Sequence, residues 1–431
     1  MEREAMQDLK GWKSKSNRKP LIIRGARQVG KTWLMQEFGK NEYKQTVYVN
    51  FESSKILRTL FDNDFDINRI ITALQIETGE QINADNTLII LDEIQEAGGA
   101  LTSLKYFFEN APQYHVIAAG SLLGVALHKQ ISFPVGKVEF LDLFPLSYKE
   151  FLVAMNQLPL LKLLGSNDWI LIEGFREKYI HLLRQYYFIG GMPEAVLSYS
   201  RLNDYAEVRA IQRRILTAYE LDFSKHAPNE IVPRIRMLWN SIPAQLAKEN
   251  KKFIYGAVKK GSRAKDFELA LSWLTDCGLV YKICRVSKPG FPLKAYEDNS
   301  AFKLFIVDVG LLAAMGSIDV KTLIDGNVIF EEFKGALTEQ YVLQQLIRTP
   351  EIAISYWSME RATAEIDFVI QANGQIIPVE VKAEENLQAK SLKVYCQKYS
   401  PPLAIRTSMS DFREENWLRN LPLYAISEVV S

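Results

Sequence analysis

The sequence predicts an α/β protein: a parallel sheet of the phosphate-loop type comes first, a helical and winged-helix-like region follows, and a second α/β domain comes last. Strand-like and helix-like segments alternate from about residue 19 to residue 151, as in sheets that helices cover on both faces. A glycine-rich loop follows the first of these strands. Near the C-terminus, two alternating apolar runs joined by Asn373-Gly374 predict a β-hairpin.

The first domain is expected to span residues 1–151. Short apolar runs bounded by turns predict five buried parallel strands, at 20–24, 46–51, 87–91, 115–119 and 138–142. The second of these strands lies in sequence between the glycine-rich loop and the third strand.

The loop has the spacing G-x-x-x-x-G-K-T, which is typical of a phosphate-binding loop when a strand precedes it and a helix follows. Glycines let the backbone close around an anion, and N–H groups at the helix start face the phosphates. Lys31 supplies a charge for the outer phosphates, and Thr32 supplies a hydroxyl for Mg²⁺. The expected phosphate-contacting residues are Gly25, Ala26, Arg27, Gln28, Val29, Gly30, Lys31, Thr32 and Trp33.

The third strand ends in Asp92-Glu93, and a carboxylate at the end of such a strand lies beside the phosphate loop. We expect Asp92 to hold Mg²⁺ and Glu93 to orient and deprotonate the attacking water. The alternative is a strand that ends in a solvated acidic turn. The fourth strand is followed by Ser121, which is expected to sense the terminal phosphate unless this segment is an ordinary turn.

Composition is that of an ordinary globular protein of two to four domains. The chain has 431 residues, of which 48% are hydrophobic, and its net charge of +1 gives no global argument for nucleic acid. No apolar run is long enough to cross a bilayer, and the charged first residues contain no signal segment, so we expect a cytoplasmic protein with no membrane partner. Three cysteines without ligand spacing indicate reduced thiols, and four scattered histidines make a histidine-based zinc site unlikely.

Residues 152–240 have a mostly helical pattern and are expected to form either a lid over the nucleotide or a plain connector. Residues 241–320 combine helices with a hairpin, which resembles a winged helix. This region contains a basic tract, which only Glu249 opposes: Lys248, Lys251, Lys252, Lys259, Lys260, Arg263 and Lys265. Such a stripe can neutralise phosphates of DNA or RNA, and the alternative is a solvated helix face.

The last domain is expected at 325–431. If Asn373-Gly374 is the two-residue turn of its hairpin, residue 371 faces residue 376, and each step outward keeps this register. Pro378 indicates an edge strand or a bulge, because proline cannot donate a hydrogen bond to a neighbouring strand.

This register places Asp367 opposite Glu380 and Glu365 opposite Lys382, on one face of the hairpin. Opposed carboxylates repel each other unless a cation lies between them. Glu339, on the preceding helix, adds a third carboxylate. Glu339, Asp367 and Glu380, with Lys382 alongside, therefore predict a second divalent-metal site suited to phosphodiester hydrolysis. The alternative is a polar outer face with a cross-strand ion pair.

The motifs, in this order, resemble the prokaryotic AAA-type ATPases that carry a C-terminal domain of unknown function, the DUF4143 group. The strand at 46–51, which lies between the loop and the Asp92 strand, resembles together with Glu93 the additional-strand, catalytic-glutamate branch to which AAA+ proteins belong. The resemblance rests on segments along nearly the whole chain: Arg24–Thr32, Leu91–Gln95, Ala119–Leu123, Gly190–Pro193, Trp273–Leu279, Phe302–Asp308, Glu339, Asp367 and Glu380–Lys382.

The resemblance implies an AAA+ core that binds ATP and Mg²⁺, a winged-helix-like middle, and a restriction-endonuclease-like end of the PD-(D/E)XK type, with the DUF4143 region at about 200–385. It predicts a Mg²⁺-dependent ATP hydrolase in which Lys31, Asp92 and Glu93 are catalytic, and whose nucleotide state rearranges the C-terminal parts. An ATP-licensed nuclease and a non-catalytic protein-binding switch stay open, as does oligomerisation.

The arginine that would reach a neighbour's phosphate is not identified. Gly136-Lys137 stands where many relatives have Gly-Arg, and lysine binds phosphate less specifically than arginine does. The candidates elsewhere are Arg213, Arg214 and Arg263.

Overall fold

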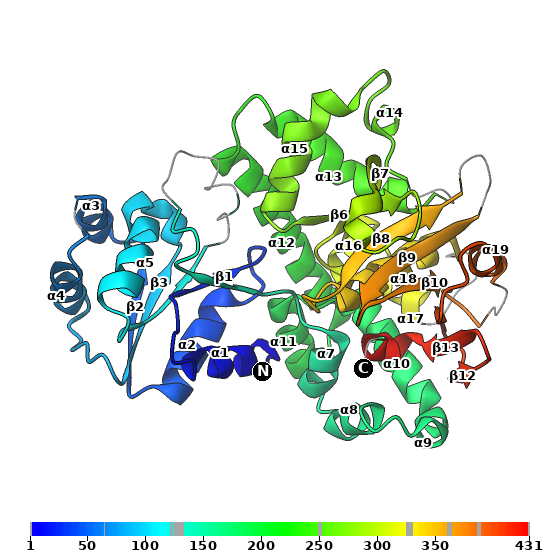
Figure 1. Ribbon diagram of the computed structural model, residues 1–431, viewed down its shortest axis with the longest axis horizontal. Helices are drawn as coiled ribbons and strands as arrows, with labels where there is room; N and C mark the ends of the chain where they lie inside the picture. Colours follow the sequence, from blue (N-terminus) through cyan, green and yellow to red (C-terminus); the bar gives the residue numbers. More distant parts are fainter. Residues whose placement is uncertain are drawn as a thin grey trace. The chain divides into compact units, whose positions relative to one another are not determined.

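The computed structural model describes residues 2–63, 65–120, 124, 133–248, 252–324, 331–359, 364–385 and 389–429. The chain forms two compact units (Figure 1). The N-terminal unit comprises Glu2–Phe144 together with Asp276–Leu279, and the C-terminal unit comprises Pro145–Thr275 together with Val280–Ser431. Within the described ranges, no helix has both the length and the apolar character needed to cross a membrane.

The N-terminal unit is built on a parallel sheet with the strand order β2-β3-β4-β1-β5. The five predicted strands are confirmed, and their ends agree with the prediction to within one residue. In chain order the elements are α1 (Ala5–Lys13), β1 (Leu21–Arg24), α2 (Lys31–Glu42), β2 (Gln45–Asn50), α3 (Lys55–Asn63), α4 (Ile67–Thr78), β3 (Thr87–Asp92), η1 (Ile94–Glu96), α5 (Gly98–Asn110), β4 (His115–Ala119) and β5 (Glu139–Asp142).

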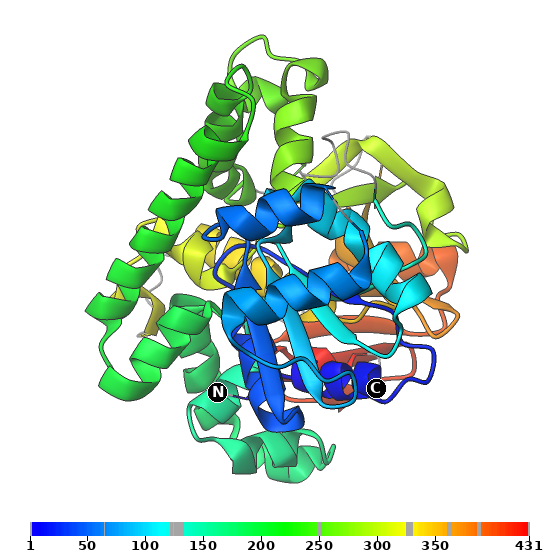
Figure 2. The same ribbon diagram turned by 90° about the vertical axis from the view of Figure 1, so that its left-hand side faces the viewer.

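Helices cover this sheet because successive side chains of each strand point to opposite faces. One set of alternate residues, including Val49, Ile89 and Val116, is buried in a cluster with side chains of α3, α4 and α5. The helix α2, which also packs against the sheet, buries Leu34 and Phe38. Figure 2 views the unit from the side of α3 and α4, the blue helices in front of the sheet. The sheet is thereby a rigid base for the loops at its strand ends.

The C-terminal unit begins with a long helical stretch. Its helices are α7 (Tyr148–Ala154), α8 (Leu158–Leu164), α9 (Trp169–Gly174), α10 (Arg176–Ile189), α11 (Pro193–Leu202), α12 (Tyr205–His226), α13 (Val232–Leu246), α14 (Tyr255–Val258) and α15 (Ala264–Asp276). The helical prediction for 152–240 is therefore correct for secondary structure, whereas the choice between a lid and a connector stays a prediction.

The turn between α10 and α11 is explained by a buried carboxylate. Gly190 has φ 75°, and a Cβ there would lie 2.1 Å from Oδ1 of Asp308. The next residue, Gly191, donates its backbone N–H to Oδ2 of Asp308 at 2.6 Å. Asp308 also accepts from the backbone of Leu311 at the start of α16 (Val309–Met315). The two distant sequence motifs around residues 190 and 308 thus form one packing contact.

The C-terminal unit contains a mixed sheet of eight strands in the order β12-β13-β11-β10-β9-β8-β6-β7. Its remaining elements are β6 (Val280–Val286), η2 (Leu293–Tyr296), β7 (Glu297–Ile306), α17 (Val320–Ile324), α18 (Glu331–Leu346), β8 (Ala353–Ser358), β9 (Glu365–Ala372), β10 (Gln375–Val381), α19 (Lys390–Tyr399), β11 (Ala404–Ser408), β12 (Arg413–Glu414), β13 (Leu418–Pro422) and η4 (Leu423–Glu428).

The structure does not separate the expected winged-helix-like domain at 241–320 from the expected domain at 325–431. The hairpin of β6 and β7 joins the C-terminal sheet, because β6 pairs in parallel with β8 through Arg285–Tyr356 and Val286–Trp357. Sequence alternation reveals that a strand exists but not which strand it will pair with.

The predicted register of the C-terminal hairpin is confirmed. Ile376 pairs with Gln371, and the antiparallel ladder continues in this register to Val379 and Phe368. Pro378, however, does not mark an edge strand, because β10 lies between β9 and β11. Pairing with β11 begins at Val379, one residue after the proline, so the proline precedes that ladder.

Candidate functional site

The loop between β1 and α2 adopts a conformation that requires glycine at both ends. Gly25 has φ 147°, and a Cβ there would lie 2.2 Å from the carbonyl oxygen of Leu143. Gly30 has φ 93° and is the N-cap of α2. Because the cap residue has no side chain, it supplies no acceptor for the N–H groups of the first turn of α2, and these groups favour an anion.

Lys31 is the first residue of α2 and is buried, with 8% of its surface exposed. Its Nζ donates to the backbone oxygens of Gly25 and Ala26, at 2.9 Å each. Burial lowers the pKa of Lys31 to about 8, and the carboxylates of Glu93 and Asp92 oppose this shift. The ammonium group is thus held at the loop by two backbone oxygens, which a phosphate oxygen can replace.

Thr32 and Asp92 connect the loop to the end of β3, as the sequence predicts for a Mg²⁺ site. The Thr32 hydroxyl donates to Oδ2 of Asp92 at 2.6 Å. Asp92 is 3% exposed, and its Oδ1 accepts the backbone N–H of Glu93 at 3.0 Å. A hydroxyl and a carboxylate so placed are the oxygen ligands that Mg²⁺ takes beside nucleotide phosphates.

Tyr48 is a site residue that the sequence reasoning missed. It lies on β2, and its hydroxyl donates to Oδ2 of Asp92 at 2.9 Å. Burial, together with the Asp92 charge, raises the pKa of Tyr48 to about 12, so the hydroxyl remains a donor at neutral pH. The only signal for this residue is a polar group in the strand next to β3, and that signal becomes specific only once the strand order is known.

Glu93 follows Asp92 in a left-handed backbone conformation, with φ 50° and ψ 45°. Its half-buried side chain accepts a hydrogen bond from Nε2 of Gln95 at 2.6 Å. Such a conformation is uncommon for a residue other than glycine and is found preferentially at functional sites. Gln95 thereby orients the Glu93 carboxylate, which the sequence predicts to be the general base.

Arg3, which precedes α1, is a second residue that the sequence reasoning missed. Its side chain is buried, and Nη1 donates to the backbone oxygen of Val29 in the loop at 3.0 Å. Nη2 donates to the backbone oxygen of Phe144 at 2.7 Å. Arg3 therefore holds the loop from the side of its carbonyl groups, which leaves N–H groups to face an anion.

The remaining predicted nucleotide-site residues are distributed around this loop. Val29 and Ala26 are buried, Arg27 is half-buried, and Gln28 is exposed. Trp33 is 39% exposed at the first turn of α2. The predicted phosphate sensor Ser121 lies outside the described residues.

The candidate arginine fingers stay predictions. Arg213 and Arg263 are exposed, and Arg214 lies 3.1 Å from a carboxylate oxygen of Glu207. Nζ of Lys137 lies 2.9 Å from Oε1 of Glu109.

A second charged site, the carboxylate cluster of Glu339, Glu365, Asp367 and Glu380, lies in the C-terminal unit. Lys303 on β7 reaches into this cluster and is fully buried. Its Nζ lies 2.6 Å from Glu365, 3.5 Å from Glu339 and 3.9 Å from Asp367. Burial alone would lower the pKa of Lys303, but these carboxylates raise it well above its ordinary value.

The structure does not assemble the predicted second metal site. Among the described residues, no group of three or more histidine, cysteine, aspartate or glutamate side chains is arranged to hold a metal ion. A cation does lie at these carboxylates: the ammonium of Lys303 is beside Glu365, Glu339 and Asp367. Lys382 contacts Glu380 at 2.7 Å, and burial raises the pKa of Glu380 against the opposing effect of Lys382. No local sequence pattern indicates that Lys303, on β7, lies beside these carboxylates.

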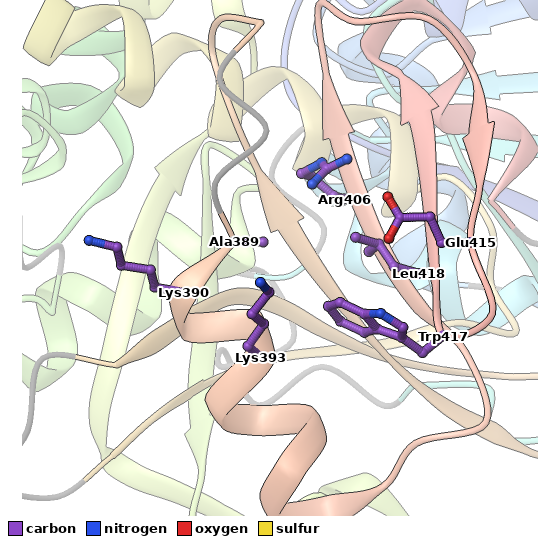
Figure 3. A pocket seen from close by; sticks show the side chains of 7 residues that line it. All are labelled: Ala389, Lys390, Lys393, Arg406, Glu415, Trp417 and Leu418. Atoms are coloured by element: carbon purple, nitrogen blue, oxygen red, sulfur yellow. The ribbon is translucent and has the colours of Figure 1, made fainter.

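A pocket of about 530 Å³ lies at the start of α19, beside β11 and the segment before β13. Figure 3 shows Lys393, Arg406 and Trp417 arranged around it, with Glu415 beside Arg406. Lys390, Ala389 and Leu418 complete the described lining. The pocket thus combines cationic groups with one indole ring.

Three family models match the sequence. An AAA domain matches residues 17–152, the domain of unknown function DUF8612 matches 180–322, and the domain of unknown function DUF4143 matches 334–426. The chain therefore carries an AAA domain and a C-terminal DUF4143 domain, as the resemblance implied. The DUF4143 match lies later in the chain than the expected 200–385. No curated protein matches the sequence.

The chain also matches solved structures, at low identity and low TM-score. The Walker-type ATPase of Pyrococcus abyssi is 14% identical, with 73% of this chain and 95% of that chain covered and a TM-score of 0.46. The Orc1 protein of Aeropyrum pernix, solved in complex with DNA, is 12% identical, with 73% and 91% covered and a TM-score of 0.28. Cdc6p of Pyrobaculum aerophilum is 11% identical, with 75% and 93% covered and a TM-score of 0.25. These scores are too low to indicate a partner for this chain.

Proposed function

We propose that this chain, with its AAA domain followed by a DUF4143 domain, is a Mg²⁺-dependent ATP hydrolase. One observation carries the proposal: the 2.6 Å hydrogen bond from Thr32 to Asp92 brings the phosphate-type loop and the acidic end of β3 together. A glycine-capped helix, a buried lysine and paired oxygen ligands are the parts that phosphoryl transfer requires.

Each residue has a distinct role in this proposal. Lys31 and the N–H groups at the start of α2 would hold the outer phosphates. Thr32 and Asp92 would hold Mg²⁺, which neutralises charge on the phosphates when it is bound. Glu93 would accept a proton from the attacking water, and Gln95 would keep its carboxylate oriented.

ATP turnover by the purified protein tests the assignment. Lys31→Ala should reduce turnover at least about 100-fold, because it removes a charge that stabilises the transition state. Lys40→Ala, on an exposed position of the same helix, is the matched control and should be unchanged. Normal hydrolysis by Lys31→Ala would refute the proposal.

Glu93→Gln separates hydrolysis from binding. The amide keeps the size of the side chain but cannot act as a base, so ATP should bind normally and turn over at least about 100-fold more slowly. Tight ATP binding with no turnover in the unchanged protein would instead favour the non-catalytic switch.

The proposal includes transmission of the nucleotide state to the C-terminal unit. Hydrogen exchange in Glu93→Gln, compared with and without ATP, should then show altered protection in elements of that unit, such as β6 and β7. Changes restricted to the N-terminal unit would contradict transmission.

Nucleic acid is a second proposed ligand, favoured by basic side chains around α14 and the start of α15. Lys248, Lys259, Lys260, Arg263 and Lys265 are exposed, Lys252 is half-buried, and Lys251 lies outside the described residues. Binding to a DNA duplex should weaken steeply with salt, and Lys259→Gln with Lys260→Gln should reduce the salt slope by about two. Salt-insensitive binding would contradict a role for these lysines.

A further inference from the structure

We propose that Lys303 is a built-in cation that occupies the place of a divalent metal in the carboxylate cluster. The carboxylates come from three elements, α18, β9 and β10, and a fourth element, β7, supplies the lysine. The DUF4143 match covers the carboxylates, whereas the DUF8612 match covers Lys303. The cluster is therefore completed from outside the domain that carries its acidic residues.

The contact distances argue that one position cannot hold both cations. Nζ of Lys303 lies within 4 Å of oxygens of Glu365, Glu339 and Asp367. A Mg²⁺ or Mn²⁺ ion would need to bind oxygens of the same carboxylates at much shorter distances. It would then lie next to a positive charge inside a weakly screened interior, where repulsion is strong.

Because Lys303 is buried, the fold itself places this cation at the carboxylates, whatever ions the solution contains. The side chain is fully buried and its Nζ lies 5.0 Å from the centre of the Tyr356 ring. An ammonium enclosed in this way has no exposed path on which to leave the carboxylates. With Lys303 beside Asp367 and Lys382 beside Glu380, this opposed pair is tolerated without an ion from solution, and the cluster holds β7 against β9 and α18 instead of activating water.

This assignment predicts that a neutral side chain at position 303 will create a metal site. Lys303→Met keeps most of the volume and removes the charge, so the carboxylates of Glu339, Asp367 and Glu380 become available to a divalent ion. Binding of Mn²⁺ to nucleotide-free protein, measured by electron paramagnetic resonance of the free ion, is the direct readout. Lys282→Met, on the paired strand β6, is the matched control. It makes the same substitution at a lysine whose Nζ lies over an aromatic ring, 4.7 Å from the centre of the Phe302 ring.

Lys303→Met should bind one additional Mn²⁺ at least about 10-fold more tightly than the unchanged protein does, and Asp367→Asn in that background should abolish the gain. If Lys303→Met does not fold, the test compares two proteins that keep Lys303. The single variant Asp367→Asn should then bind Mn²⁺ as the unchanged protein does. A site in the unchanged protein that Asp367→Asn removes would overturn the proposal, as would a folded Lys303→Met that gains no site. None of these readouts depends on ATP turnover.

The pocket beside α19 supports a second, independent proposal. The geometry points to a binding site for a nucleoside phosphate unit. Arg406 is 3% exposed, and its Nε donates to Asn420 at 2.9 Å, which fixes the guanidinium at the pocket wall. Lys390 and Lys393 add charge at the first turns of α19, where the helix dipole also favours an anion. Trp417 offers the flat face on which a base stacks.

The combination of groups favours a nucleotide over an acidic peptide. A peptide carboxylate would use the cations but not the indole, whereas a base and its phosphate use both. Glu415 lies beside Arg406 and offers an acceptor for an exocyclic amine of a base (Figure 3). The same unit occurs in single-stranded nucleic acid and in a free mononucleotide.

Fluorescence anisotropy of a labelled single-stranded DNA 12-mer, without ATP or divalent ions, tests the site. Trp417→Leu and Lys393→Gln should each weaken binding at least about 5-fold, whereas Lys398→Gln, on the same helix outside the pocket lining, should not. Binding of adenosine monophosphate that Trp417→Leu removes, without binding of the strand, would identify the free nucleotide as the source. No binding of either probe, or binding that both variants leave intact, would overturn the assignment.

Discussion

Lys31 in the N-terminal unit and Lys303 in the C-terminal unit are both buried lysines near carboxylates, but their partners differ. Lys31 donates to two backbone oxygens, and burial lowers its pKa to about 8. Lys303 contacts three carboxylates, which raise its pKa. An ammonium held by backbone oxygens can exchange them for phosphate, whereas one paired with carboxylates stabilises the fold. The partners of a buried lysine, more than its burial, thus indicate whether it binds a ligand.

The largest expected effect comes from removing Lys303. Lys303→Met leaves the buried Glu339 and the half-buried Glu365 and Asp367 without their cation, and it should lower the free energy of unfolding of the C-terminal unit by about 3–5 kcal/mol. A raised pKa means that this contribution is fully present below the ordinary lysine pKa and is lost only as pH rises through the raised value. Thermal unfolding at pH 7 measures the loss. A change below about 1 kcal/mol would contradict the comparison.

In nucleotide-free protein, the charge of Lys31 should have the opposite effect on stability to that of Lys303. Its folded pKa of about 8 lies below the ordinary value of 10.5, so the unfolded chain binds more protons between these two values. The stability of the N-terminal unit should therefore rise with pH across that window, by up to about 3 kcal/mol. Lys31→Met should be stabilising at pH 7 by up to the same amount and should lose this pH dependence. Thermal unfolding from pH 7 to pH 10 checks both, with Lys40→Met as the control.

The lowered pKa also predicts weaker ATP binding in mild alkali. As pH rises through about 8, free Lys31 loses its charge, so the KM for ATP should increase about 10-fold between pH 7 and pH 9. Lys31→Arg keeps its charge in this range and should flatten the profile, whatever its absolute activity. Steady-state kinetics over this range gives the answer, and identical profiles would contradict the role of Lys31.

The smallest effect should come from Tyr48→Phe. The change removes one hydrogen bond to Asp92, of about 1 kcal/mol, and should lower turnover about 5-fold and raise the Mg²⁺ concentration needed for half-maximal rate. Tyr43→Phe is the matched control, because the Tyr43 hydroxyl pairs with His115 instead. Equal effects of the two changes would show that Tyr48 acts only through packing.

The sequence predicted what local chemistry determines. Gly25 and Gly30 are needed for backbone conformations within one loop, and the Asn373-Gly374 turn determines a register of consecutive residues. Both predictions required only short segments. The end of β3 at Asp92 was predictable for the same reason, because apolar length and a following acidic pair mark it.

Contacts between distant segments were not predictable from one sequence. Arg3 reaches Val29, Tyr48 reaches Asp92, and Lys303 reaches Glu365, and in each case no local pattern names the partner. The predicted second metal site missed Lys303 for this reason: the carboxylates were identified, but the lysine beside Glu365, Glu339 and Asp367 lies on another strand. The membership of β6 and β7 in the C-terminal sheet was missed in the same way.

The position of Lys303 has a practical consequence for dissecting this protein into fragments. A recombinant fragment cut to the DUF4143 match, 334–426, would begin after β7 and lack two of the eight strands. Its β8 would become an open sheet edge, which promotes aggregation, and its acidic interior would have lost a counter-charge. If such a fragment is insoluble, the cause would be the position of its N-terminal boundary. A fragment for expression should therefore begin upstream of Val280, where β6 starts.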